Sequence, residues 1–312
     1  MDVTELTTFL TVARAGAITA AARELNTVQS NVTARIRMLE DEIGLPLFER
    51  RSRGMALTEA GQRLLPYAER VLALLREARQ AAREDGAAQG PLGIGAMETT
   101  AAIRLPPLLA AFHQACPAVR LSVQAGPTAQ LVEAVLRREI DGAFVAGPIQ
   151  HGELTALPAF SEELGLVTQA SIGEGDLAAA LGREGLTILT FRQGCSYRQR
   201  LEQVLARFGQ PTYARLEFGT LDGILGCVAA GVGITLMPRA VVAQAAQREA
   251  LRWHKLDGEG GEATTLFVRR RDAYESEAMR RFVGLLGEGV AGEASSGKVR
   301  AGSRRAAAVL TA

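Results

Sequence analysis

Apolar residues recur at helical spacing in three short segments near the start of the chain. Their apolar faces run through residues 6–13, 18–25 and 32–43. Gly16 ends the first segment and Gly44 ends the third, while Asn26 and Thr27 precede the third and offer capping side chains. A turn-rich strip then follows to residue 57. The pattern predicts a small helical domain at 1–58, in which two helices meet at a tight turn.

Residues 58 to about 85 predict one long helix, which Thr58 can cap. Apolar side chains alternate along it in steps of four and three and form a seam: Leu64, Tyr67, Val71, Leu74, Ala78 and Ala81. A solitary helix with such a seam needs a partner to cover it, so we expect a dimerising linker helix at 59–88. Packing of the seam on its own domain is the alternative.

Beyond this helix, short apolar strands alternate with helices. GAAQGPLG at 86–93 is predicted to be a hinge from its glycine and proline content. The predicted strands are LGIGA, VRLSVQA, GAFVAG, LGLVT, TILTF, GITLM and TLFVR. Their alternation with helices predicts an α/β domain at 92–287, and its length favours two subdomains. Residues 288–312 have little to bury, so we expect a disordered tail.

Composition fits a globular chain and excludes several classes of protein. The chain has 312 residues, of which 47% are hydrophobic and 22% charged, and this suits two or three domains. No apolar run reaches the roughly 18 residues that span a bilayer, and MDVTELTTFL does not resemble a signal peptide. Cys116, Cys195 and Cys227 form no CxxC pair, so we expect reduced thiols in a cytoplasmic protein without membrane association. The histidines lack zinc-ligand spacing, and we expect neither a metal nor a cofactor.

The third predicted helix has an outer face suited to nucleic acid. Facing away from its apolar side, or flanking that direction, are Gln29, Ser30, Asn31, Thr33, Ala34, Arg35 and Arg37. Short hydrogen-bonding side chains and arginines suit base edges and phosphates, and two helices at a tight turn form a helix-turn-helix arrangement. Arg50, Arg51 and Arg53 follow on a turn that suits a wing on the DNA backbone. The net charge is only +1, so this prediction depends on local arrangement; the alternative is a small helical interaction domain with a chance arginine cluster.

The residues that carry this face resemble a known family. The run LTTFLTVARAGAITAAARELNTVQSNVTARIRMLEDEIGLPLFERRSRGMALTEAG closely resembles the winged helix of LysR-type transcriptional regulators. The α/β remainder is similar to that family's effector domain, which has the fold of type 2 periplasmic binding proteins. Covering roughly 1–287, the resemblance implies a winged helix-turn-helix, a long linker helix and a two-subdomain effector domain. Subdomain I would span about 92–162 and 266–287, and subdomain II about 163–265.

The resemblance also implies functional residues and partners. Gln29, Ser30 and Thr33 match family positions that contact DNA bases, and Arg53 matches the wing. The chain departs from many members by having Ala34 before Arg35, where they carry arginine directly after position 33. The implied partners are double-stranded promoter DNA, a small-molecule effector, RNA polymerase and further copies of the chain in a homotetramer. The effector half is further similar to a subgroup related to the glutamate-synthase regulator.

Three predicted strand ends in the effector half lead into helices that begin with hydroxyl side chains. GAMETTAAIRLPP, FRQGCSYRQRLE and EFGTLDGIL supply Thr99, Thr100, Cys195, Ser196 and Thr220. Helix N-termini attract anions, and Arg192 and Arg198 adjoin one of them, so we expect a carboxylate-bearing effector in a cleft. Taken singly, each hydroxyl is better explained as an N-cap, but three such sites on the same end of an α/β sheet are better explained by a ligand cleft. Cys195 could instead serve a redox sensor, but Cys227 lies far from it in sequence, and pocket lining is favoured.

Catalytic motifs are missing from the sequence. It contains no GxSxG, Walker loop, HExxH or GxGxxG after a strand, so we predict no enzymatic activity. The rival hypothesis is an enzyme or solute-binding module on a periplasmic-binding-protein fold, with an N-terminal helical interaction domain. That hypothesis leaves the first 57 residues unexplained. We therefore predict a bacterial, sequence-specific DNA-binding transcriptional regulator controlled by a small, anionic effector.

Overall fold

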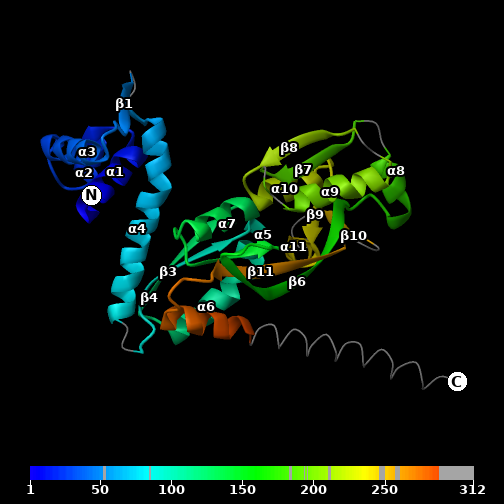
Figure 1. The fold of residues 1–312 in the computed structure, drawn as a ribbon. Coiled ribbons are helices and arrows are strands. Elements are labelled where there is room, and N and C mark those ends of the chain that lie inside the picture. Colours follow the sequence, from blue (N-terminus) through cyan, green and yellow to red (C-terminus); the bar gives the residue numbers. More distant parts are fainter. Residues whose placement is uncertain are drawn as a thin grey trace. The chain divides into compact units, whose positions relative to one another are not determined.

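The chain forms two compact units. The computed structural model describes residues 1–51, 54–83, 86–182, 185–192, 194, 196–209, 212–245, 250–256 and 261–287. The first unit comprises Met1–Glu84 with Arg137–Glu139, and the second comprises Asp85–Leu136 with Ile140–Ala312 (Figure 1). Arg53, Cys195 and the predicted tail at 288–312 lie outside the described residues. Within the described part of the chain, no helix is both long and apolar enough to cross a membrane.

The first unit begins with a winged helix-turn-helix, as the resemblance implies, and its three helices lie where the periodicity predicts them. Its elements are α1 (Val3–Ala15), α2 (Ile18–Glu24), α3 (Gln29–Ile43), β1 (Phe48–Arg51) and β2 (Gly54–Leu57). Phe9, Val32 and Leu39 are fully buried in its core, and the two strands pair antiparallel as the wing. Gly16 and Gly44 end α1 and α3 in the left-handed conformation, with φ of 66° and 77°.

Two glycines allow close approaches within this unit. The N–H of Met55 donates to the carbonyl of Gly16 (2.7 Å), and a Cβ on Gly54 would overlap that same carbonyl oxygen. A Cβ on Gly61, in the first turn of the next helix, would overlap the carbonyl oxygen of Leu47. Because glycine has no Cβ at these two positions, the wing and the following helix can lie directly against neighbouring backbone.

The long helix α4 runs over Glu59–Arg83, and the Thr58 hydroxyl accepts from the N–H of Gly61 (3.1 Å) as predicted. The seam divides into two parts. Leu64 packs against the core of its own domain, so the alternative of self-packing holds for this residue. Tyr67, Val71 and Leu74 remain 64%, 42% and 54% exposed. An uncovered apolar strip thus runs along the middle of α4.

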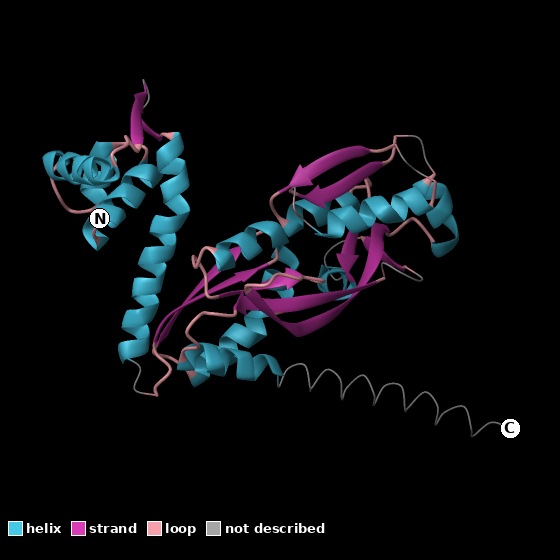
Figure 2. Ribbon diagram, viewed as in Figure 1, coloured by secondary structure: helices cyan, strands magenta, loops and turns pink. Residues whose placement is uncertain are grey.

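The first half of the second unit is a sheet between two layers of helices (Figure 2). Parallel strands β3 (Gly90–Ala96), β4 (Val119–Ala125) and β5 (Gly142–Ala146) lie beside antiparallel β11 (Glu262–Arg270) and β6 (Leu154–Gln169). The helices are α5 (Glu98–Ile103), α6 (Leu105–Ala115), α7 (Thr128–Leu136) and a helix at 277–287. The predicted hinge at 86–93 is partly wrong, because Gly90–Gly93 already pair with β4.

Strand β6 continues into the second half of this unit. It pairs with β11 as far as Glu163, and from Leu164 onward with β9 and β10. The remaining elements are β7 (Thr187–Phe191), β8 (Ala214–Phe218), β9 (Thr235–Pro238), β10 (Leu251–Lys255), η1 (Glu174–Asp176), α8 (Leu177–Leu181), α9 (Ser196–Arg207), α10 (Leu221–Ala229) and α11 (Arg239–Ala245). Strands β7 and β8 are parallel. One curled sheet thus crosses between two subdomains, as the resemblance implies.

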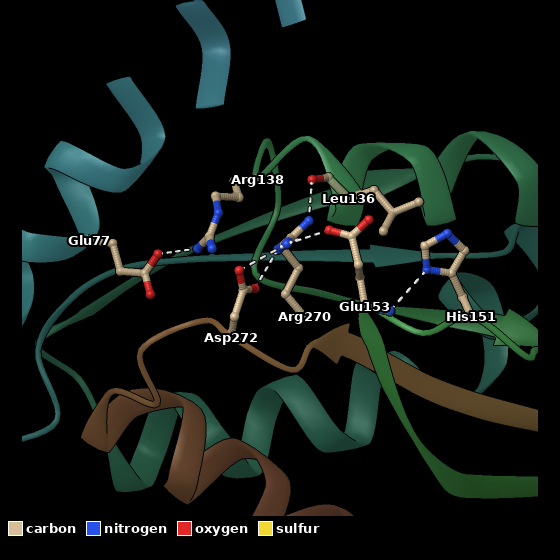
Figure 3. A network of polar contacts seen from close by, with 7 residues as sticks. All are labelled: Glu77, Leu136, Arg138, His151, Glu153, Arg270 and Asp272. Carbon is tan, nitrogen blue, oxygen red and sulfur yellow. Dashed lines mark hydrogen bonds and ion pairs between the residues drawn. The ribbon is translucent and has the colours of Figure 1, made fainter. Parts of the chain in front are cut away.

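A buried arginine ties three segments of subdomain I together. Arg270, whose side chain is 5% exposed, donates to the Leu136 carbonyl (2.8 Å), Glu153 Oε2 (2.7 Å) and Asp272 Oδ1 (2.7 Å) (Figure 3). The hydrogen bond to Asp272 raises the pKa of Arg270 above its ordinary value, and that to Glu153 acts in the same direction. The end of α7, the start of β6 and the turn after β11 are therefore held at one point.

Candidate functional site

The start of α3 lies open at the surface of the winged helix. Val28 is its N-cap and makes no side-chain cap, so the prediction that Asn26 or Thr27 caps α3 is wrong. Asn26 instead takes a left-handed turn conformation with φ of 49°. The Thr27 hydroxyl accepts from Asn31 Nδ2 (3.1 Å). The N–H groups at the start of α3 are therefore not covered by a capping side chain.

The candidate DNA-contacting side chains of α3 divide by how they are held. Gln29, Ser30 and Arg37 are exposed, and their side chains make no hydrogen bond with other described residues. The Thr33 hydroxyl, by contrast, donates to the Gln29 carbonyl (2.9 Å). Arg35 is half-buried at the edge of the same face. Gln29, Ser30 and Arg37 are thus the side chains of this face best placed to meet an outside partner.

A surface hollow of about 470 Å³ adjoins this face between α2 and the start of α3. It is lined by Thr19, Ala22, Arg23, Thr27, Val28, Gln29 and Ser30. Three hydroxyls and an arginine in one hollow suit a phosphate. The sequence pattern did not single out Thr19 or Arg23, and it marked Thr27 only as a possible cap. The available signal was Arg23, which follows the buried Ala21 and Ala22 on the open side of α2.

The wing adds positive charge beside the helical core. Arg50 and Arg51 are exposed on β1, and Arg51 Nε bonds Glu49 Oε1 (2.8 Å). Of the described wing arginines, Arg50 is therefore the one without an ion pair to a described carboxylate.

In the second unit, carboxyl ends of parallel strands carry the predicted effector residues. Thr99 and Thr100 follow β3 in the first turn of α5 and are buried, with 4% and 2% of their surface exposed. They are not caps, because Met97 is the N-cap of α5 and makes no side-chain bond. Their hydroxyls make no hydrogen bond with other described residues.

The strand ends of subdomain II face those of subdomain I. A Cβ on Gly194, after β7, would lie 3.2 Å from Pro127 Cβ, just before α7. Arg192 lies beside Gly219 at the end of β8, where an added Cβ would be 3.6 Å from its Nη2. Thus the ends of β4, β7 and β8 converge, with the exposed Arg192 among them. Such facing strand ends form the usual ligand crevice of α/β folds.

Other predicted effector residues are placed less favourably. Thr220 is the N-cap of α10 and accepts from the Gly223 N–H (3.3 Å), which is the plain capping alternative. Arg198 bonds Glu217 Oε1 (2.9 Å) and Glu202 Oε1 (3.3 Å), so its charge is offset. Ser196, half-buried, begins α9. The electrostatic argument for an anionic ligand therefore rests on Arg192 rather than Arg198. No cluster of potential metal ligands occurs in the described ranges.

A winged helix with an open recognition face, joined to two α/β subdomains with facing strand ends, defines a DNA-binding regulator with a ligand-binding domain. Comparison with known families agrees. Residues 3–62 match the bacterial regulatory helix-turn-helix protein, lysR family, and residues 85–291 match the LysR substrate binding domain. The chain belongs to the LysR family of transcriptional regulators. It is a DNA-binding regulator with an effector-binding domain and not an enzyme.

Individual relatives support this assignment. The chain is 42% identical to the regulator GltR of Bacillus subtilis over 283 residues, covering 91% of this chain and 95% of GltR. It is 44% identical to YusT of the same organism, covering 91% and 94% of the two chains. Full-length CbnR, solved in complex with its target DNA, superposes with a TM-score of 0.68 at 25% identity, covering 92% of this chain and 99% of CbnR. A full-length OxyR variant of Pseudomonas aeruginosa shares the fold, with a TM-score of 0.66 at 23% identity and coverage of 92% and 94%.

Proposed function

We propose that this regulator responds to a small carboxylate that binds between its two effector subdomains. The observation that carries the proposal is the convergence of strand ends at Gly194 and Pro127, with Arg192 exposed beside them. Thr99 and Thr100 supply buried hydroxyls from subdomain I, and Ser196 supplies one from the start of α9. A guanidinium and several hydroxyls are the donors that a carboxylate needs. Two further residues belong to the proposed lining. Thr220 also caps α10, and Cys195 lies outside the described residues.

The proposed DNA contacts follow from the exposed face of α3. Gln29 and Ser30 meet base edges, Asn31, Thr33 and Arg35 flank them, and Arg37 contacts phosphate or a base. Thr19, Arg23 and Thr27 hold a phosphate in the hollow beside them. Arg50 and Arg53 place the wing against the backbone.

The exposed strip on α4 supports self-association. Tyr67, Val71 and Leu74 are large apolar side chains that a second copy would cover. Pairing two winged helices at fixed spacing is how such proteins recognise a two-part site, and we propose a dimer that assembles further into a tetramer. RNA polymerase is the partner through which bound protein would act, and the cytoplasm is the compartment where promoter DNA is found.

Calorimetry on the full-length chain tests the ligand proposal. The probes are succinate, glutarate and benzoate, each paired with its uncharged amide. A carboxylate should bind and its amide should not, and Arg192→Ala should weaken binding about tenfold or more. Arg207→Ala, at the exposed far end of α9, is the matched control and should have no effect. Binding of amides as tight as that of acids, or equal effects of both variants, would contradict an anionic ligand.

A further inference from the structure

An ion pair joins the helix that carries Thr99 and Thr100 to the strand that links the subdomains. Arg104 lies between α5 and α6, and its N–H donates to the Thr100 carbonyl (2.9 Å). Its guanidinium forks onto Glu162 of β6, with Nε 2.9 Å from Oε1 and Nη2 3.3 Å from Oε2. The side chains are 21% and 7% exposed. A two-pronged bond with so little water around it fixes direction as well as distance.

Arg104 is held at a second point on the same strand. Its Cζ lies over the ring of Phe160, 5.4 Å from the centroid, and Phe160 stacks on the buried Phe144 with centroids 5.6 Å apart. Phe160 and Glu162 are two residues apart in β6, so both project from one face of the strand. The arginine therefore lies along two successive side chains of that face, and α5 cannot shift without moving them.

Glu162 stands where β6 leaves subdomain I. It pairs with Ala263 of β11, whereas Leu164, two residues later, pairs with β9. The intervening Glu163 projects from the opposite face and bonds Arg239 of subdomain II (3.1 Å). That second pair is open to water, with side chains 36% and 66% exposed, and is worth little in energy. Only the Arg104–Glu162 pair of these two is therefore firm enough to transmit a displacement.

Helix α5 also contacts the other subdomain. Ile103, next to Arg104, packs against the apolar cluster formed by α10, α11 and strands of subdomain II. The first turn of α5 thus carries the candidate ligand residues Thr99 and Thr100. Its last residue, Ile103, contacts subdomain II, and the next residue, Arg104, is bonded to the crossover strand β6.

We propose that Arg104 and Glu162 are positioning residues that couple α5 to the crossover in β6; the ligand's part in this rests on the proposed function above. A ligand held by Thr99 and Thr100 shifts α5, and the ion pair passes that shift to residues 162–166. Without the Arg104–Glu162 ion pair, a displacement of α5 no longer reaches β6. The exposed Glu163–Arg239 pair does not transmit such a displacement.

The chain carries its own spectroscopic reporter of this crossover. Trp253 is its single tryptophan, and a Cβ on Gly165 of β6 would overlap the indole ring. The indole N–H donates to the Met237 carbonyl (3.2 Å). Any displacement of β6 at residue 165 changes the surroundings of this ring, and therefore its emission.

The decisive experiment uses no ligand. The substitution Ala101→Gly destabilises the helix α5 itself. It is introduced into three full-length chains: the unchanged chain, the Glu162→Gln variant and the Glu163→Gln variant, which is the matched control. In the unchanged chain it should raise amide hydrogen exchange about threefold in α5 and at 162–166, and shift Trp253 emission. In the Glu162→Gln variant, Ala101→Gly should still raise amide hydrogen exchange in α5. Exchange at 162–166 and the Trp253 emission should no longer respond to it. In Glu163→Gln the full response should persist.

A merely structural role for Glu162 would alter stability but leave the transmitted response intact, so the response and not the melting temperature is the readout. Transmission that survives Glu162→Gln, is lost equally in Glu163→Gln, or is missing from the unchanged chain overturns the proposal. Should Glu162→Gln fail to fold, Arg104→Lys replaces it, because lysine keeps the charge without the fork. Failure of every carboxylate probe to bind would sink the proposed function without affecting this test.

Discussion

Replacing Leu74 by alanine is expected to weaken self-association of the regulator. Leu74 lies in the middle of α4 with 54% of its surface exposed, next to the exposed Val71. Within the winged-helix core, Leu64 is the seam residue that packs on its own domain, so Leu74 has a different task. Shortening it should leave the fold of one copy intact.

The expected magnitude follows from the exposed area. Removing three carbons from a fully buried leucine costs about 2.4 kcal/mol, at about 0.8 kcal/mol per carbon. Because only 54% of Leu74 is available for burial by a partner, the loss is about 1.3 kcal/mol per copy. A twofold interface contains the residue twice, which gives about 2.6 kcal/mol and a dissociation constant higher by about eightyfold.

Sedimentation velocity over a range of concentrations measures this constant. Leu45→Ala is the matched control, because Leu45 is 50% exposed and lies outside α4. Equal effects of the two variants would show that general surface apolarity, and not the α4 strip, drives association. An unchanged constant for Leu74→Ala would refute the reasoning directly.

Further outcomes are expected from four other substitutions. Gln29→Ala should reduce the preference of the protein for the DNA upstream of its own gene over unrelated DNA. The difference in binding free energy should fall by about 1–3 kcal/mol in competition binding, and an unchanged difference would count against a base contact. Arg23→Ala should weaken all sequences alike and lower the salt slope by about 1, whereas a change in base preference would contradict a phosphate contact. Gly61→Ala should destabilise the winged helix by about 1–3 kcal/mol in thermal unfolding, because the added Cβ overlaps the Leu47 carbonyl. Gly226→Ala, in α10 with nothing within 4 Å, should stabilise the protein by about 0.5–1 kcal/mol, so similar shifts for both glycines would refute the packing argument.

The winged helix could be predicted from sequence because its signals are local. Each helix shows its buried face through spacing alone, as Val32, Ile36 and Leu39 do in α3. The glycines that end α1 and α3 sit where the left-handed conformation is needed. The same locality explains why the strand-to-helix turns of the effector half were found.

Other strands were predicted only in part. Only the end of strand β8 was predicted, at EFG, although Ala214–Phe218 alternates apolar and polar residues along its whole length; all but the last of these residues are exposed. The first part of β6 contains Pro158 and was not predicted, because its burial depends on β11, which comes about 100 residues later in the chain.

The contacts of the predicted effector residues depend on partners of the same kind. Arg198 looked like a ligand arginine from its place beside a helix start, yet its partner Glu217 is on β8. The Thr220 hydroxyl accepts from the Gly223 N–H, which bears out its capping role, while its ligand-binding role stays a prediction. Partners distant in sequence decide what a charged or hydroxyl side chain does, and one local motif does not contain them.

The return of β11 to subdomain I has a consequence for how the protein is made. Phe267 and Phe282 are fully buried beside Phe112 and Phe144, so the core of subdomain I contains residues from both ends of the effector domain. During synthesis the winged helix can fold as soon as its own residues emerge, whereas subdomain I must wait until subdomain II has been made. Until then Phe112 lacks Phe282, and Phe144 lacks Phe267 and has only Phe160 as an aromatic partner, so both stay available to chaperones. A ribosome that stops before residue 262 therefore releases a chain able to hold DNA-binding structure but unable to complete its sensor.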